Sequence, residues 1–257
     1  MMEEKLLNWA KETYDIYSAL AKGDDIGFYS QTPLCGIKEP VKVVVMGINP
    51  GSGGSFSNMK EGGDWGFGKL GKEEAYWHLM RGNVCWQEEH TAWCYWNIVM
   101  NLLSKAYPGI KENEDKECVF TNATFFNSTQ AKGVPEELYQ KTLPCTLKLI
   151  EILSPEMVIS LSPDNFDRMV RALHNDFKHM RVFDRGLILG EYKDILFVSI
   201  YHPSPRNMMY SIAYKNLVKK ALAFIREKRN LPMDEIVASL QKSLQEEWNA
   251  VKNGRKA

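Results

Sequence analysis

The chain has 257 residues, and its 32 lysines and arginines balance 32 aspartates and glutamates, so the formal net charge is zero. Hydrophobic residues make up 44% and charged residues 25%, which is ordinary for a soluble globular protein. This balance excludes a basic tail that coats nucleic acid indiscriminately and an acidic disordered chain, but it leaves room for a basic patch on one face.

The N-terminal residues and the cysteines predict an intracellular, cytoplasmic protein. Residues 1–15 form an acidic amphipathic helix pattern, without the basic region and apolar run of a signal peptide. No stretch approaches 18 apolar residues, so we expect no membrane span. The cysteines form no C-x-x-C pair, and we therefore expect reduced thiols, no metal and no cofactor. They are Cys35, Cys85, Cys94, Cys118 and Cys145.

Strand-like and helix-like segments alternate along the chain. The strand candidates are almost continuously apolar, as in strands covered on both faces of a parallel sheet. In chain order the sequence predicts a helix over 1–15, a strand over 41–49, a helix over 73–105, a strand over 118–126, a helix over 135–153, a strand over 156–162, a helix over 163–177, a strand over 195–202, and helices over 208–229 and 232–251. This alternation predicts an α/β fold, a three-layer αβα sandwich with a central, mainly parallel four-stranded sheet.

The ends of the predicted strands carry the main functional signal, because ligands of open parallel sheets bind beyond the carboxyl ends of the strands. Three of the four strands end in polar or Gly/Pro-rich loops, namely GINPGSGG, TNATFFNST and YHPSPRN. The remaining strand runs into a helix start, with Ser162 as N-cap and Pro163 at the first helical position. We expect the three loops to converge on one rim.

The first loop, GINPGSGGS, is rich in glycine. Gly47 and Gly51 permit close backbone approach or a positive φ, and Pro50 stiffens the turn between them. The loop lacks the lysine of a P-loop, and Phe56 stands where the dinucleotide fingerprint needs its third glycine. A generic anion nest remains an alternative. Asn49, a neutral amide in the tightest part of the loop, is suited to hold a water molecule rather than to act as a strong base.

The other two loops each present one polar side chain at a strand end. His202 precedes a turn stiffened by Pro203 and Pro205, from which Arg206 projects a cation suited to a polyanion or a groove. The amide of Asn122 offers a donor and an acceptor together, which matches the N3–H and C4=O edge of a pyrimidine. Both have structural alternatives, a histidine that packs at a strand end and an asparagine that caps a turn.

Two of these motifs together resemble the uracil-DNA glycosylase superfamily. Gly47-Ile48-Asn49-Pro50-Gly51 and His202-Pro203-Ser204-Pro205-Arg206-Asn207 stand in the family's order, with Asn122 between them. The motifs look closest to the single-strand-selective monofunctional and mismatch-specific branches. The resemblance spans residues 40–225 of one domain over 1–257, to which the terminal helices are additions. It implies hydrolysis of the N-glycosidic bond of uracil, or a related deaminated base, flipped out of DNA by a monomer.

The resemblance assigns roles residue by residue. Asn49 would hold the attacking water, and His202 would stabilise negative charge on the leaving base as a neutral imidazole. Asn122 would read the base edge, with Asn127 competing for that role. The further substrate- and DNA-binding positions are Gly47, Ile48, Pro50 and Gly51 in the first loop, the stacking aromatic Phe67 (or Trp65), and the minor-groove loop Ser204, Pro205, Arg206 and Asn207.

Several alternatives stay open. Ser52-Gly53-Gly54 departs from the family pattern, so the preferred base is open between uracil, a substituted uracil, xanthine and hypoxanthine. No lysine lies in either motif, and we expect no Schiff base and no strand nicking. Two other functions remain possible: a non-catalytic nucleic-acid-binding member of the same fold, and an α/β enzyme that binds a nucleotide phosphate at the Gly-rich loop.

Basic residues concentrate between positions 202 and 229. Seven cations stand there against one acid, Glu227. The cations are Arg206, Lys215, Lys219, Lys220, Arg226, Lys228 and Arg229. We expect this segment to neutralise DNA phosphates, with an affinity that falls as the salt concentration rises.

Overall fold

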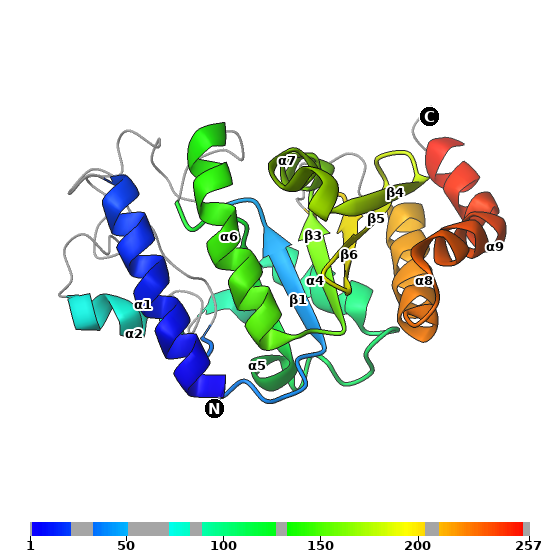
Figure 1. Ribbon diagram of the computed structural model, residues 1–257. Helices are drawn as coiled ribbons and strands as arrows, with labels where there is room; N and C mark the ends of the chain where they lie inside the picture. Colours follow the sequence, from blue (N-terminus) through cyan, green and yellow to red (C-terminus); the bar gives the residue numbers. More distant parts are fainter. Residues whose placement is uncertain are drawn as a thin grey trace. The chain divides into compact units, whose positions relative to one another are not determined.

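The computed structural model of the protein describes residues 2–21, 33–50, 72–82, 89–126, 133–203 and 211–253. These residues form an α/β fold with one six-stranded mixed sheet flanked by helices (Figure 1). The strands are β1 (Val43–Gly47), β2 (Cys118–Asn122), β3 (Met157–Leu161), β4 (Lys178–Phe183), β5 (Leu187–Tyr192) and β6 (Ile195–Ile200). Their order in the sheet is β2-β1-β3-β6-β5-β4. The pairs β1–β2 and β3–β6 are parallel, whereas β4–β5 and β5–β6 are antiparallel.

All four predicted strands are present, as β1, β2, β3 and β6, but the prediction of a four-stranded sheet is wrong. The sheet also contains the hairpin of β4 and β5. The first four residues of β4 are exposed or half-exposed, so β4 lacks the continuous apolar run of a strand covered on both faces. A register shift between Arg181 and Phe183 further interrupts its pattern.

The helices are α1 (Met2–Ala21), α2 (Lys72–Arg81), α4 (Cys94–Leu103), α5 (Glu114–Glu117), α6 (Glu136–Leu153), α7 (Pro163–Leu173), α8 (Ile212–Lys228) and α9 (Met233–Asn253), with 3-10 turns η4 (His90–Ala92) and η5 (His174–Asp176).

The prediction of one helix over 73–105 is wrong, because α2 ends before Gly82, whose φ of +74° is typical of a helix C-terminus. The start of α7 is confirmed: the Ser162 hydroxyl accepts the Asp164 N–H at 3.2 Å, and Pro163 follows Ser162. None of the described helices is both long and apolar enough to cross a membrane.

The chain divides into two compact units. The first unit comprises residues 1–89 and 118–155, and the second unit comprises residues 90–117 and 156–257. The expectation that residues 1–257 form one domain of the glycosylase type stays a prediction.

In the first unit, the N-terminal helix is part of the core. Helix α1 packs along α6 and α2, and Figure 1 shows α1 and α6 side by side. The indole N–H of Trp9 donates to the Cys145 carbonyl on α6 at 2.7 Å. The rings of Trp9 and Tyr17 contact Phe125, with centroid distances of 5.9 and 5.5 Å. Helix α1 therefore supports the segment that follows β2.

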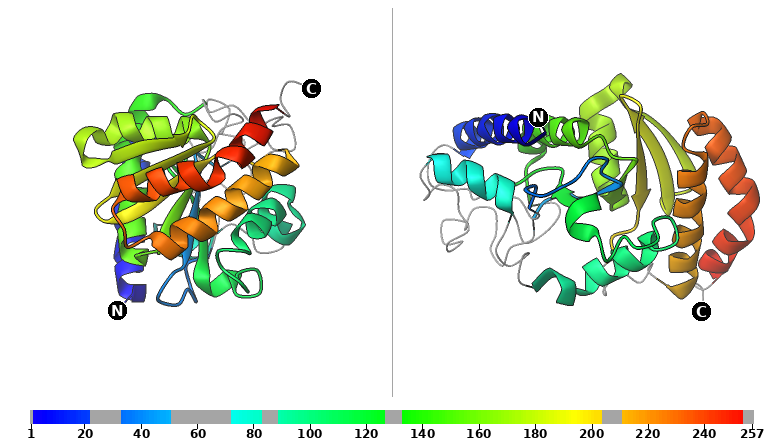
Figure 2. Two further views of the ribbon diagram at one scale, coloured as in Figure 1. Left: turned by 90° about the vertical axis from the view of Figure 1, so that its right-hand side faces the viewer. Right: turned by 90° about the horizontal axis from the view of Figure 1, so that it is seen from below.

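In the second unit, α8 and α9 lie against each other (Figure 2). Lys220 on α8 pairs with Glu247 on α9 at 2.5 Å. Trp248 of α9 stacks on Phe183 at the end of β4, with ring centroids 5.5 Å apart. Helix α9 is therefore packed on both the helical and the sheet part of this unit, which makes it more than a C-terminal extension.

Candidate functional site

The first loop and Asn122 lie together in the first unit. Strands β1 and β2 pair in parallel register up to Gly47, which lies opposite Asn122. The ladder continues beyond the strands, since the N–H groups of Ala123 and Thr124 donate to the carbonyls of Gly47 and Ile48 at 2.9 and 3.1 Å. The structure thus brings the start of the G-x-N-P loop and the end of β2 to the same edge, as the sequence predicts for this pair of strands.

The Asn122 side chain lies directly over Gly47. A Cβ atom built on Gly47 would lie 2.6 Å from Asn122 Oδ1, closer than real Cβ contacts come. Glycine is needed here for close approach and not for a special φ, because the φ of Gly47 is not in the positive region. Asn122 is 2% exposed. A polar amide at the carboxyl end of a strand is therefore held beside the loop that carries Asn49.

Buried hydroxyl groups fix the backbone around Asn122. The Thr146 hydroxyl on α6 donates to the Asn122 carbonyl at 2.8 Å. The Thr142 hydroxyl donates to Thr124 Oγ1 at 2.9 Å, and the Tyr17 hydroxyl accepts the Phe125 N–H at 2.8 Å. Burial also raises the pKa of Tyr17, so its hydroxyl stays protonated. The sequence did not reveal these supports; two threonines four residues apart on one helix face are the available signal.

Asn49 is half-buried at the exit of β1. Its amide nitrogen donates to the Pro50 carbonyl at 3.0 Å. This hydrogen bond orients the side-chain amide, whose oxygen belongs to the class of atoms that accept from water. Ile48 and Pro50 on either side are buried, which limits the room in which this short loop segment moves.

His202 lies in the second unit, two residues beyond β6. The preceding residue is anchored, because the Tyr201 N–H donates to the hydroxyl of Tyr214 on α8 at 2.8 Å. Tyr214 is fully buried and donates to the Gly186 carbonyl at 2.7 Å. The neighbouring strand end is tied as well, since the Ser162 N–H donates to the Ile200 carbonyl at 2.8 Å. The chain therefore leaves β6 in a defined direction just before His202.

The imidazole of His202 reaches the surface, yet protein atoms crowd the ring enough that desolvation lowers its pKa below the ordinary value near 6.5. A lowered pKa favours the neutral imidazole at pH 7.

The lowered pKa gives a stability prediction with a defined sign. Between the folded and the unfolded pKa of His202, the unfolded chain binds more protons, so stability falls as the pH drops through about 6.5. We expect His202→Gln to lose less stability than the wild type when the pH falls from 7.5 to 5.5. These two pH values lie about one unit above and below the unfolded pKa of about 6.5. Urea unfolding at the two pH values measures this difference, and an equal loss in the two proteins contradicts the assignment.

Several predicted site residues lie outside the described residues. They are Gly51, Trp65, Phe67, Asn127, Ser204, Pro205, Arg206 and Asn207. Asn49 belongs to the first unit and His202 to the second, and their pairing stays a prediction. In the described part of the chain, no group of three or more His, Cys, Asp or Glu side chains is arranged to hold a metal ion.

The basic segment is only partly available to a ligand. Arg226 pairs with Glu156 at 3.1 Å, donates to a backbone carbonyl and lies over the Tyr107 ring, 4.4 Å from its centroid. Arg229 also approaches Glu156, at 3.6 Å. Lys220 and Lys228 pair with Glu247 and Glu227 at 2.5 and 2.8 Å. At least four of the seven cations are therefore engaged within the second unit, which the local charge count does not reveal.

Comparison of the chain with protein-family models and with curated proteins finds no match.

Proposed function

We propose that this protein is a monofunctional DNA glycosylase of the uracil-DNA glycosylase type, which hydrolyses the N-glycosidic bond of uracil or a related deaminated base flipped out of DNA. The observation that carries the proposal is the packing of the Asn122 amide on Gly47, at the base of the loop that holds Asn49. The proposal includes the three-layer αβα arrangement of that family around the sheet.

Asn122 has the chemistry needed to read the base. Its amide presents one donor and one acceptor, and uracil presents an acceptor at C4=O and a donor at N3–H. Cytosine reverses this pattern, because it carries an exocyclic amine and an unprotonated N3. The backbone at Asn122 is fixed from two sides, by Gly47 and Thr146. A rigid amide discriminates better than a mobile one, since a mismatched base then leaves a buried polar group unpaired.

Asn49 and His202 supply the two catalytic functions. Cleavage develops positive charge on the sugar and negative charge on the leaving base. The reaction therefore needs a water positioned to attack the sugar and a hydrogen-bond donor aimed at the leaving base. The oriented amide of Asn49 holds the water, and neutral His202 donates to the base O2. An amide gives the sugar cation less electrostatic support than a carboxylate would, and we expect slow turnover. The abasic strand remains intact.

The test is a base-release assay on end-labelled oligonucleotides. The substrates are a U:G duplex, single-stranded uracil DNA, and strands with xanthine or hypoxanthine. We expect alkali-labile sites from at least one substrate and no breaks before alkali. Binding of these strands without release supports the non-catalytic alternative. Affinity for free nucleotides without any for DNA supports the nucleotide-phosphate alternative, and either result contradicts the proposal.

A further inference from the structure

The turn between β4 and β5 packs against helix α9. The Gly186 N–H closes this turn by donating to the Phe183 carbonyl at 2.8 Å. A Cβ atom built on Gly186 would lie 2.7 Å from the Trp248 ring, closer than real Cβ contacts come. Trp248 is 3% exposed and also stacks on Phe183. Glycine at position 186 therefore lets the indole of α9 rest directly on this turn.

The hydroxyl of Tyr214 connects the same turn to the end of β6. It donates to the Gly186 carbonyl at 2.7 Å and accepts the Tyr201 N–H at 2.8 Å. A phenol has one proton and two lone pairs, so both hydrogen bonds form at once. Tyr214 is fully buried, and its own N–H donates to Ser211 Oγ at 3.2 Å in the first turn of α8. The Tyr214 ring is thus fixed at both ends, by the helix backbone and by the bonds of its hydroxyl.

The peptide group that joins β6 to Tyr201 is bonded on both sides. Its carbonyl accepts the Ser162 N–H at 2.8 Å, and its N–H donates to Tyr214. A peptide group is planar, so hydrogen bonds on its two edges define its orientation. His202 follows Tyr201, and the buried Pro203 comes next. A residue before proline is itself restricted to extended backbone, so the fixed peptide group and Pro203 together confine His202.

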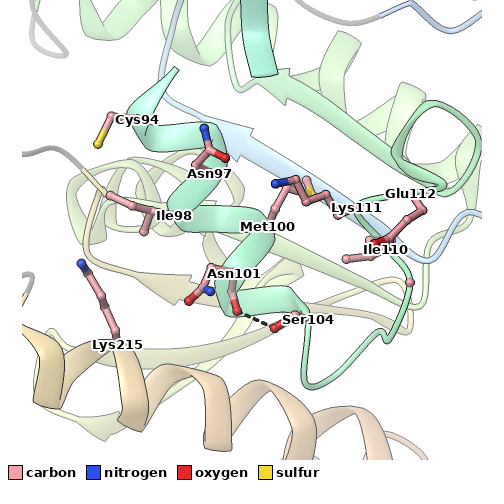
Figure 3. A pocket seen from close by; sticks show the side chains of 11 residues that line it. Cys94, Asn97, Ile98, Met100, Asn101, Ser104, Ile110, Lys111, Glu112 and Lys215 are labelled. Atoms are coloured by element: carbon pink, nitrogen blue, oxygen red, sulfur yellow. Dashed lines mark hydrogen bonds between the residues drawn. The ribbon is translucent and has the colours of Figure 1, made fainter. Parts of the chain in front are cut away.

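The next residue of α8 faces a different part of the second unit. Lys215 lines a cavity of about 550 Å³ that α4 and residues 109–112 complete (Figure 3). Consecutive residues of a helix point about 100° apart, and neither Tyr214 nor Trp248 is among the described residues that line this cavity. Asn101, an exposed amide of α4 at the wall of the cavity, therefore offers a control position in the same unit.

We infer that Tyr214 is a positioning residue for His202, and that helix α9 supports it through the contact of Trp248 with Gly186. The inference rests on the proposed function for the role of His202, and it deepens that function by naming what aims the imidazole at the leaving base. A displacement of about 1 Å removes much of the effect of His202, because a donor stabilises charge only at hydrogen-bond distance. Helix α9 is then part of the catalytic apparatus, although no sequence motif marks it.

Tyr214→Phe tests the inference, because it keeps the ring and removes only the hydroxyl. We expect single-turnover base release to fall roughly ten- to hundred-fold, with DNA affinity within about two-fold of wild type. Tyr107→Phe is the matched control, since this tyrosine is 1% exposed in the same unit and lies under Arg226, near the other end of α8. Tyr107→Phe and Asn101→Ala should both release base at the wild-type rate.

Proton NMR gives a readout that needs no catalysis. The chain has five histidines, and the signal of His202 is the one missing from His202→Gln. Desolvation lowers the pKa of His202 below 6.5 in the wild type, and we expect this pKa to rise toward 6.5 in Tyr214→Phe, because a less confined ring gains water. Gly186→Ala, whose methyl meets the Trp248 ring, should shift the same signal in the same direction. A merely structural role, seen as a lower melting temperature alone, moves neither signal.

Each outcome has a defined meaning. Release at the wild-type rate by Tyr214→Phe overturns the positioning role and keeps the proposed function, and so does an equal loss of release in Tyr107→Phe. An unchanged His202 pKa in both Tyr214→Phe and Gly186→Ala overturns the positioning role as well. If Tyr214→Phe does not fold, Gly186→Ala decides by the same two measurements. A shifted His202 pKa, without release of any base by the wild-type protein, removes the function and keeps the positioning of His202.

Discussion

Replacing His202 with alanine is expected to slow base release by roughly 10²- to 10³-fold at saturating enzyme, since one aimed donor to a developing negative charge contributes about 3–4 kcal/mol to transition-state stabilisation. Asn49→Ala removes the amide that holds the water, and we expect a loss of similar size. Both substitutions act on the chemical step, so single-turnover rates should fall more than DNA affinity does. The rate is measured with labelled uracil strands under enzyme excess.

Matched controls separate these losses from general damage. His179 is an exposed histidine on β4, and Asn249 is an exposed asparagine on α9 that accepts from Gln245 at 3.1 Å. Alanine at either position should leave base release within about two-fold of wild type, as for surface positions away from a site. If His202→Ala and Asn49→Ala behave like these controls, the catalytic assignment of the two residues is wrong.

Gly47→Ala is expected to disrupt both stability and base release. The added methyl would lie 2.6 Å from Asn122 Oδ1, and neither strand can easily move because the two are paired in register at this point. Overpacking of this kind costs on the order of 1–3 kcal/mol. The displaced Asn122 amide would no longer face the base as proposed, so release of uracil should fall further than the stability loss explains. Urea unfolding and single-turnover release measure the two effects.

A double-mutant cycle separates strain from function. In Gly47→Ala/Asn122→Ala, the side chain that meets the new methyl is gone, so stability should recover relative to Gly47→Ala. Base release should remain low, because the reading amide is absent. Recovery of both properties contradicts the role of Asn122 in base recognition, and recovery of neither contradicts the close contact as the source of strain.

The parts of the fold that the sequence predicted are those with strong local signals. The apolar runs of β1, β2, β3 and β6 mark strands covered on both faces, and Ser162-Pro163 marks the start of α7. The hairpin of β4 and β5 gave no such signal, because half of β4 is exposed. The segment 73–105 was predicted as a single helix, although Gly82 with its positive φ ends α2.

The site shows the same division. The parallel strands β1 and β2 are neighbours, and their ends bring Gly47 and Asn122 together; the sequence signal for this was the polar or Gly-rich loop at the end of each strand. The supports depend on contacts between residues far apart in the chain. The Tyr17 hydroxyl accepts the N–H of Phe125, 108 positions away, and Arg226 pairs with Glu156, 70 positions away. The charge counted along the sequence therefore overstated the positive charge that α8 offers to a ligand, because Lys220 and Arg226 form ion pairs with distant residues of the second unit.

The most direct test of the central claim is mass spectrometry of a single-turnover reaction on one single-stranded uracil oligonucleotide. The account predicts free uracil together with a full-length strand of abasic mass, and it predicts neither product at the same time points with Asn49→Ala. An unchanged oligonucleotide mass with wild-type protein, for uracil and for the other deaminated bases, would contradict the account, and so would release at the wild-type rate by Asn49→Ala.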